Sequence, residues 1–434
     1  MNRDSASGNS LLTPFRVRSF RYQWPADLAT SWAFEMEMLI LGWYVLVETK
    51  SVFMLTVFAS LQYIGTLLSP MFGVAGDRIG QRAVLTAMRI FYASLAAVLM
   101  VMAFTDAVTP MRVLVIAALL GLVRPSDIGV RTAMVGDIMP PQHLMAAMSI
   151  QRTTQDSARI TGALTGAGMV ATLGMGPAYA VVVAFYLTSS VLTWRAGRVH
   201  AYVASREAGS LDAGSPKESL PAKTGGEAHP LKDLREGLAY VWRTPHLLAV
   251  MLFAFLLNVT AFPLFNGLMP YVAKHVYLAD QTTLGTMVAV SAGGALTGSL
   301  LMSRFGNRFT PARAMLGFGA AWLGMLLLFA QTSTPDAGRP LLFIAGVFQT
   351  MGLIPINTLL IRSTDQRYRG RIMGIRMLVI YGNLPGLLLA GPFIAQYGYT
   401  AMASTYSVAG IAIIAWIGWR WRRHLWHRAA AANG

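Results

Sequence analysis

Cysteine is absent from this 434-residue chain, and charged residues make up only 12% of it. The absence of cysteine excludes disulfide bonds, thiolate catalysis, iron–sulfur clusters and cysteine-type zinc sites. A soluble domain carries about a quarter charged residues, so the low charge content excludes an ordinary soluble enzyme. The chain also lacks a Gly-x4-Gly-Lys-Ser/Thr phosphate loop and a His-Glu-x-x-His zinc motif. We therefore predict no ATP-driven motor, no metal site and no cofactor.

Acidic residues are scarce relative to basic ones. The chain has 35 Lys and Arg against 19 Asp and Glu, which gives a net charge of +16. Such an excess points to nucleic acid in a soluble protein, but cytoplasmic loops of membrane proteins also collect Lys and Arg. The first twelve residues are polar, and the hydrophobic run that follows is too long for a signal peptide. We predict an uncleaved cytoplasmic N-terminus, a lipid bilayer as partner and no nucleic acid.

Apolar residues, 55% of the chain, gather in runs long enough for membrane helices of ~20 residues. The runs lie near 23–47, 52–75, 83–104, 111–136, 146–171, 176–195, 246–270, 282–303, 311–330, 340–361, 373–396 and 400–419. We predict an all-α integral membrane protein with twelve transmembrane helices in two six-helix bundles. Its expected parts are a tail (1–21), a first bundle (22–195), a linker (196–244), a second bundle (245–421) and a tail (422–434).

The distribution of basic residues predicts the orientation. The loops on one side and both tails hold 25 Lys and Arg, whereas the loops on the other side hold four. Both termini are therefore expected to be cytoplasmic, in an inner (plasma) membrane. Within the linker, Leu231, Leu234, Leu238 and Val241 recur at helical spacing, which predicts an amphipathic helix on the inner membrane surface.

Two loops in corresponding places of the bundles are alike, as in transporters built from tandem six-helix halves. Gly73-Val74-Ala75-Gly76-Asp77-Arg78-Ile79-Gly80-Gln81-Arg82 follows the second run, and Ser303-Arg304-Phe305-Gly306-Asn307-Arg308 follows the eighth. The first loop resembles the loop pattern of the major facilitator superfamily, matching it at Gly73, Asp77, Arg78, Gly80 and Arg82. Gln81 departs from that pattern, where a basic residue is usual. The resemblance covers essentially the whole chain.

This resemblance implies that the loop closes an inner gate against the eleventh span, with Arg78 and Arg82 reaching Asp137 at the end of the fourth. A solvated turn rich in positive charge is the alternative. From the residues themselves, Gly73 and Gly76 would allow another helix to approach closely, and Gly80 permits a tight turn. More narrowly, segments 158–162 and 234–245 resemble the branch that contains siderophore and drug exporters, with Ala163 where proline is common.

Charged residues lie inside the predicted spans of the first bundle, where each costs ~2.5–3.5 kcal/mol and is presumed functional. The fourth and fifth spans each carry an Arg–Asp–Arg triplet on one face: Arg124, Asp127 and Arg131, and Arg152, Asp156 and Arg159. The triplets mirror each other about the predicted turn at 141–142, so the diagonal pairs Asp127–Arg152 and Asp156–Arg124 are available. With Glu35 and Glu37 of the first span, the charges cancel, as burial demands.

We interpret three of these residues as proton-coupling candidates, because the resemblance places the first and fourth spans beside the cavity: Glu35, Asp127 and Arg124. A carboxylate near Arg124 would be protonated when substrate or a conformational change separates the pair, which biases the alternating states. Glu35 is the first choice. The others are assigned to a buried ion network that fixes helix packing: Glu37, Arg131, Arg152, Asp156 and Arg159.

The second bundle shows uncharged polar residues instead of acids in its spans. Asn258, Gln349 and Asn357 are candidates for contact with substrate, although polar side chains also join helices. The sequence predicts a secondary transporter that exports a small amphiphilic molecule, with protons as the driving ion. The alternatives are uptake or flipping of an anionic solute or lipid, and a transport-dead sensor or assembly partner. A membrane enzyme is least favoured, because no nucleophile–base pair stands out.

Overall fold

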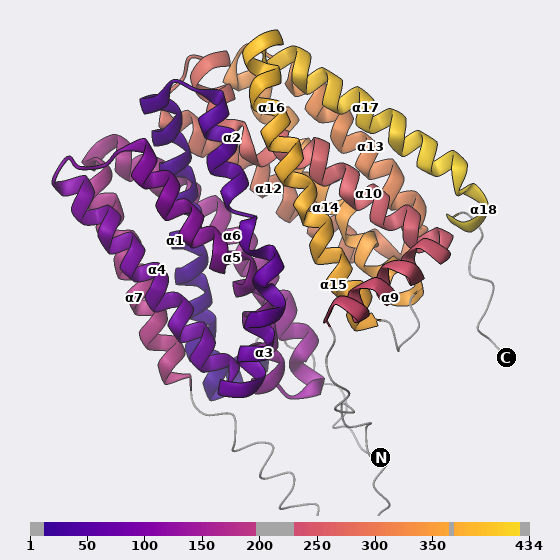
Figure 1. Ribbon diagram of the computed structural model, residues 1–434, viewed down its shortest axis with the longest axis horizontal. Helices are drawn as coiled ribbons and strands as arrows, with labels where there is room; N and C mark the ends of the chain where they lie inside the picture. The colour runs from indigo at the N-terminus through magenta and orange to yellow at the C-terminus, as the bar shows by residue number, and fades with distance from the viewer. Residues whose placement is uncertain (1–12, 197–229, 364–368, 426–434) are drawn as a thin grey trace, which may run out of the picture.

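All regular structure in the computed structural model, which describes residues 13–196, 230–363 and 369–425, is helical. The first half contains η1 (Thr13–Arg16), α1 (Arg18–Thr49), α2 (Val52–Leu61), η2 (Ile64–Leu68), α3 (Ser69–Ile79), α4 (Gln81–Phe104), α5 (Pro110–Ile138), α6 (Pro141–Leu173) and α7 (Met175–Arg195). The second half contains α9 (Pro230–Arg243), α10 (Pro245–Phe262), η3 (Pro263–Gly267), α11 (Met269–Tyr271), η4 (Val272–Val276), α12 (Gln281–Phe305), η5 (Gly306–Arg308), α13 (Pro311–Phe329), α14 (Pro335–Ser363), α15 (Arg369–Val379), η6 (Ile380–Gly382), α16 (Asn383–Tyr397), α17 (Tyr399–Arg420) and α18 (Arg422–Leu425). The two halves lie side by side (Figure 1), which confirms the predicted fold of twelve spans in two bundles.

The membrane-spanning helices differ in how apolar they are. Within the described residues, nine segments are long and apolar enough to cross a membrane by themselves. The remaining spans are α1, the α2–α3 segment and α6, all in the first half. α1 and α6 each carry several charged residues, and the α2–α3 span is interrupted by a 3-10 turn. These helices therefore depend on their neighbours to satisfy polar groups inside the bilayer.

Proline, threonine, aspartate and glycine set the helix boundaries. Proline stands at the first helical position of α5, α10 and α13, where its missing N–H costs nothing. Thr109 and Asp280 cap α5 and α12, each by accepting a hydrogen bond from a backbone N–H three residues later. Gly80, Gly174 and Gly398 join successive helices with positive φ angles of 92°, 84° and 83°, which side-chain-bearing residues rarely adopt. The tight turn predicted at Gly80 is thus confirmed.

The α2–η2 segment packs against α5 with backbone-to-backbone contact. A Cβ atom added to Gly65 would lie 2.1 Å from the carbonyl oxygen of Leu122, and one added to Gly121 would lie 1.9 Å from that of Leu61. Both glycines are therefore required by this close approach. It brings Gln62, which follows α2 directly, beside the charged face of α5.

The two halves contact each other through α2 with α16 and through α6 with α12. Gly391 and Gly285 form these seams: an added Cβ would lie 2.7 Å from Thr56 Oγ1 and 2.6 Å from Ala167 Cβ, respectively. Both seams lie at the end of the molecule where α1 ends and α17 begins, called the far end below. At the opposite end, where α1 begins and α17 ends, α3 and α15 lie apart (Figure 1). We call this opposite end the termini end.

A helix follows the linker, in the segment where the leucine spacing predicts one. In α9, Val241 is buried in the core of the second half, whereas Leu238 and Trp242 are exposed. The helix contacts α10 and α15 at the termini end. The linker residues 197–229 lie outside the described residues.

Candidate functional site

Arg124, at the middle of α5, forms a buried ion pair with Glu37 of α1. Its Nη2 contacts Glu37 Oε2, and its Nη1 donates to Gln62 Oε1 at 3.1 Å. The hydroxyl of Tyr186 on α7 donates to the same Glu37 oxygen at 3.1 Å. The guanidinium lies 4.1 Å from the ring centroid of Phe34, within cation–π range. The Arg124–Glu37 pair therefore joins side chains of α1, α5, α7 and the end of α2 under an aromatic ring, although Arg124 Nε and Glu37 Oε1 have no hydrogen-bond partner among the described residues.

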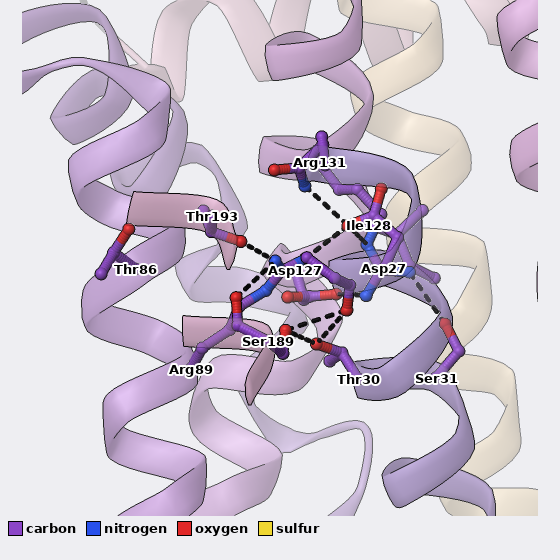
Figure 2. Close-up of polar contacts among 12 residues, drawn as sticks. Asp27, Thr30, Ser31, Thr86, Arg89, Asp127, Ile128, Arg131, Ser189 and Thr193 are labelled. Carbon is purple, nitrogen blue, oxygen red and sulfur yellow. Dashed lines mark hydrogen bonds and ion pairs between the residues drawn. The ribbon is translucent and has the colours of Figure 1, made fainter. Parts of the chain in front are cut away.

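A second charged cluster lies nearer the termini end and joins α1, α4 and α5 (Figure 2). Asp27 Oδ1 contacts Arg89 Nη2 and lies 3.4 Å from Arg131 Nε. Arg131 Nη2 lies 2.5 Å from Asp127 Oδ2, one helical turn earlier on α5. Arg89 is fully buried, and the other three side chains are nearly so. We call these four residues, Asp27, Arg89, Asp127 and Arg131, the buried quartet; their charges cancel, which limits the cost of burial.

Neutral side chains add hydrogen bonds to the buried quartet, although Arg89 Nε and Asp127 Oδ1 have no partner among the described residues. Gln23 Nε2 donates to Asp27 Oδ1 at 2.7 Å, and Arg131 Nη1 donates to Ser31 Oγ at 2.9 Å. Arg89 donates to Thr193 Oγ1 of α7. Side chains of α1, α4, α5 and α7 thus form one buried polar cluster within an apolar bundle.

A third group of charges lies on α6, and one of them, Arg159, contacts the second half. Arg152 Nε lies 3.3 Å from Asp156 Oδ2, but the Arg152 side chain is 62% exposed. Arg159 Nη2 donates to Asn266 Oδ1 of η3, so this bond crosses between the halves. Glu35 of α1 interacts electrostatically with Arg159, Arg124 and Asp156. Within the described residues, Glu35 makes no hydrogen bond or ion pair.

A pocket of about 70 Å3 lies between the halves. Its polar lining comes from Gln62, Tyr63, Asn266 and Asn383, and its apolar lining includes Met38, Phe58, Phe262 and Leu387. Sites for drug-sized ligands hold roughly 300 Å3 or more, so in this state the pocket accommodates a small group. No cluster of three His, Asp or Glu suited to a metal ion occurs in residues 13–196, 230–363 and 369–425.

Several predicted ion pairs form differently. Asp127 pairs with Arg131, one turn away on the same helix, and the carboxylate at Arg124 is Glu37 rather than Glu35 or Asp127. The diagonal pairs Asp127–Arg152 and Asp156–Arg124 do not form, because the charged face of α5 turns toward α1 and α4 instead of α6. The assignment of Arg152 to a buried network is also wrong, since its side chain lies on an exposed face of α6.

Two central residues, Asp27 and Arg89, are missing from the sequence-based candidates. Both lie inside predicted hydrophobic runs, at 23–47 and 83–104. Their presence there was the available signal, because ionisable residues at membrane depth are rare. Including them leaves the charge of the cluster balanced, since they contribute one negative and one positive charge.

The loop between α3 and α4 follows the sequence expectations in part. An added Cβ at Gly73 would meet nothing within 4 Å, so no helix approaches there, contrary to the prediction. Gly76 is buried, and an added Cβ would lie 2.2 Å from Gln81 Oε1, the first residue of α4. Arg78 and Asp137 are exposed at the termini end. The side chain of Asp77 lies outside the described residues.

The polar candidates of the second half do not line the pocket. Asn258 contacts a residue that lines the pocket: its Oδ1 accepts a hydrogen bond of 2.6 Å from Asn383 Nδ2. Gln349 is buried and Asn357 is half-buried on α14. Asn266 and Asn383, rather than Gln349 and Asn357, are the amides that the second half contributes to this pocket.

Comparisons with known proteins agree with this architecture. No curated protein matches the chain significantly. Among solved structures, a bacterial homolog of the human lysosomal transporter Spinster, in an inward-facing and unoccupied conformation, is 13% identical with a TM-score of 0.70, covering 96% of this chain and 100% of that one. The nucleoside transporter NupG is 13% identical with a TM-score of 0.66 (92% and 98% covered), and a D-xylose-proton symporter is 10% identical with a TM-score of 0.67 (92% and 96% covered). The sequence model of the Major Facilitator Superfamily matches residues 28–389, and the chain therefore belongs to that superfamily of transporters.

Proposed function

We propose that this transporter exports a small amphiphilic molecule, drug-like or siderophore-like, in exchange for protons. The observation that carries the proposal is Glu35, a partly exposed carboxylate on α1 without a hydrogen bond or ion pair among the described residues. It lies where α1 packs against α6, near Arg159, whose side chain contacts the second half. A carboxylate placed there can exchange its proton when access alternates between the two sides of the membrane.

The proton step follows from the cost of charge at this depth. An unpaired carboxylate at membrane depth is expensive while charged, so either a proton or a cationic group stabilises it. Binding of one therefore competes with binding of the other. The Arg124–Glu37 ion pair lies near the Glu35 carboxylate that exchanges its proton. Gln62, which accepts a hydrogen bond from Arg124, also lines the pocket and so connects this ion pair to it.

The orientation of the cycle is part of the proposal. With both termini cytoplasmic in an inner membrane, the termini end faces the cytoplasm. The present arrangement, with its seams α2–α16 and α6–α12 at the far end, then corresponds to an inward-facing state. We assign the α3–α4 loop, with Arg78, Arg82 and Asp137, to a gate that closes at the termini end in the opposite state.

Export as the direction rests on the resemblance of segments 158–162 and 234–245 to siderophore and drug exporters. The fold itself serves both directions, since a proton symporter for D-xylose shares it. Uptake or flipping of an anionic solute or lipid is the second candidate, favoured by Arg159 of α6, which contacts the second half without an ion pair among the described residues. A transport-dead sensor on the same scaffold is distinguished by its lack of substrate-driven flux.

Purified protein in proteoliposomes with an imposed pH gradient tests the proposal. A panel of amphiphilic cations, anions and zwitterions is added, and the internal pH is followed with an entrapped dye. We expect at least one compound to cause proton flux in the wild type. Glu35→Gln should abolish gradient-driven accumulation while substrate exchange across the membrane continues, because the neutral amide still fits the site but carries no proton.

Glu48→Gln is the matched control, because Glu48 lies on the same helix but is exposed at its far end. It should leave proton flux and accumulation unchanged. Undiminished proton coupling in Glu35→Gln would reject Glu35 as the proton carrier. The absence of flux with every compound would support the sensor instead.

A further inference from the structure

Close packing of α1 on α6 places Glu35 beside Arg159. A Cβ atom added to Gly162 would lie 2.7 Å from Glu35 Cβ, so α6 touches α1 at this residue. Arg159 lies one turn before Gly162, on the same face of the helix. Trp24 and Trp32 of α1 fix the register by donating hydrogen bonds of 2.8 Å to Thr154 and Thr165 of α6.

These two opposite charges nevertheless do not pair. In the described part of the chain, Asp27, Glu37, Asp127 and Asp156 each pair with an arginine, whereas Glu35 does not. Arg159 likewise forms no ion pair there; its hydrogen bond goes to the amide oxygen of Asn266. The Glu35 carboxylate can therefore still accept hydrogen bonds, and the neighbouring Arg159 guanidinium can still donate them.

Both charges lie near the pocket between the halves, although neither side chain lines it. Tyr63, which lines the pocket, interacts electrostatically with Arg159 and with Glu35. Asn266, the hydrogen-bond partner of Arg159, lines it as well. The two charges therefore lie behind the polar lining of a pocket whose other walls include Met38 and Phe262.

We infer that Glu35 and Arg159 form the subsite for the head group of a substrate that carries both a cationic and an anionic group on an apolar body. This inference rests on the proposed function and specifies its substrate class. A purely cationic ligand at Glu35 would meet Arg159 and Arg124, and a purely anionic ligand at Arg159 would meet Glu35 and Asp156. A zwitterion satisfies both charges at once and adds no net charge to the buried site.

The experiment uses two sets of three compounds that differ only in charge. L-phenylalanine, phenethylamine and 3-phenylpropanoate share one apolar body, and L-tryptophan, tryptamine and indole-3-propionate share another. Binding to purified wild-type protein is measured by thermal shift and by calorimetry, without a membrane or a gradient. We expect the zwitterion to bind about tenfold or more tightly than either singly charged analogue in at least one set. Equal or weaker binding of the zwitterions in both sets, or no binding, would overturn the inference.

Charge variants assign the preference to the two residues. Glu35→Gln should make the anion bind as well as or better than the zwitterion, and Arg159→Gln should do the same for the cation. Arg152→Gln is the matched control, because it makes the same change on the same helix at a 62% exposed side chain; the preference should persist. Unchanged selectivity in Glu35→Gln and Arg159→Gln, with both proteins folded, would place the head group elsewhere.

Failure of this inference is distinguishable from failure of the proposed function. A zwitterion preference that depends on Glu35 and Arg159, without proton flux in liposomes, would retain the site and reject proton coupling. Proton-coupled transport of singly charged compounds without zwitterion binding would retain the proposed function and reject the substrate class.

Discussion

In the first half of the molecule, the interior holds the buried quartet and the Arg124–Glu37 pair, whereas in the second half it holds Trp322 packed edge-on against Phe262 and Phe265. In the described residues, all six spans of the second half are apolar enough to cross a membrane unaided, but only α4, α5 and α7 of the first half are. The two bundles share one fold. Among the described residues, however, it is in the first bundle that buried charges find their partners on other helices, so these charges are paired only once the helices have packed together.

We interpret this difference as two different roles of the halves in the proposed transport. Ion pairs have several possible partners and respond to protons and charged ligands, whereas a close-packed aromatic core resists deformation. In the proposed function, the second half therefore supplies the apolar wall of the site and the first half the charged groups that bind protons and substrate. Contacts that cross between them, such as Arg159 with Asn266, are where a change of charge in one half reaches the other.

The strongest test of this comparison is Asp27→Asn. It leaves Arg89 and Arg131 sharing one fewer carboxylate in a buried site, and breaking such a network costs about 3–5 kcal/mol. We expect a loss of that size in reversible detergent unfolding, and a sharply lowered yield. Asn258→Ala, which removes a polar contact of the second half, should cost about 1 kcal/mol.

The double variant Asp27→Asn/Arg89→Gln separates charge balance from lost hydrogen bonds. Because it removes one charge of each sign, it should recover part of the stability that Asp27→Asn loses. Similar losses for Asp27→Asn and Asn258→Ala would contradict the division between the halves.

The sequence predicts the local part of this chemistry and not the part between helices. The spacing of Asp127 and Arg131 fixes their pairing, because residues four apart adjoin on any α-helix, and the same holds for Arg152 and Asp156. Which carboxylate of α1 pairs with Arg124 depends on how α1 and α5 are rotated about their helix axes. That rotation follows from packing across the whole bundle, including the backbone contact at Gly121, and has no signature in either helix alone.

The break in the second span shows the same limit. A continuous hydrophobic run near 52–75 predicts one helix, but α2 ends at Leu61 and the chain continues as η2 and α3. Tyr381 of the second half supports this turn: its hydroxyl accepts a hydrogen bond of 2.6 Å from the Leu67 N–H and donates one of 3.2 Å to the Ile64 carbonyl. A partner more than 300 residues away in the sequence therefore satisfies backbone groups that the turn leaves open.

Tyr381→Phe tests how strongly this contact holds the halves in the observed arrangement. Losing two hydrogen bonds of about 0.5–1.5 kcal/mol each should shift the population toward states closed at the termini end. Spin labels on Thr132→Cys and Met377→Cys, exposed on α5 and α15, report the distance between the halves. The chain has no cysteine, so these are its only thiols.

Tyr397→Phe is the matched control for this measurement, because Tyr397 is exposed at the end of α16. Its distance distribution should equal that of the wild type. An unchanged distribution in Tyr381→Phe as well would mean that the far-end seams alone hold the state.

The smallest expected effect concerns a surface charge of the second half, Asp280, which caps α12. Hydrogen bonds from the side chain and the backbone N–H of Thr283 hold the pKa of Asp280 below its usual value of 3.8. Its stabilising contribution is therefore fully present above pH 3.8 and is lost as the pH falls through the lower folded-state value.

Asp280→Ala should cost about 1 kcal/mol at pH 7, and the difference from wild type should shrink at acidic pH. Asp106→Asn, at an exposed residue without a hydrogen bond in the described part of the chain, is the control and should leave stability unchanged. A loss at Asp280 as large as that at Asp27 would show that depth in the membrane does not set the value of a charge in this protein, and the contrast between the halves would then need another cause.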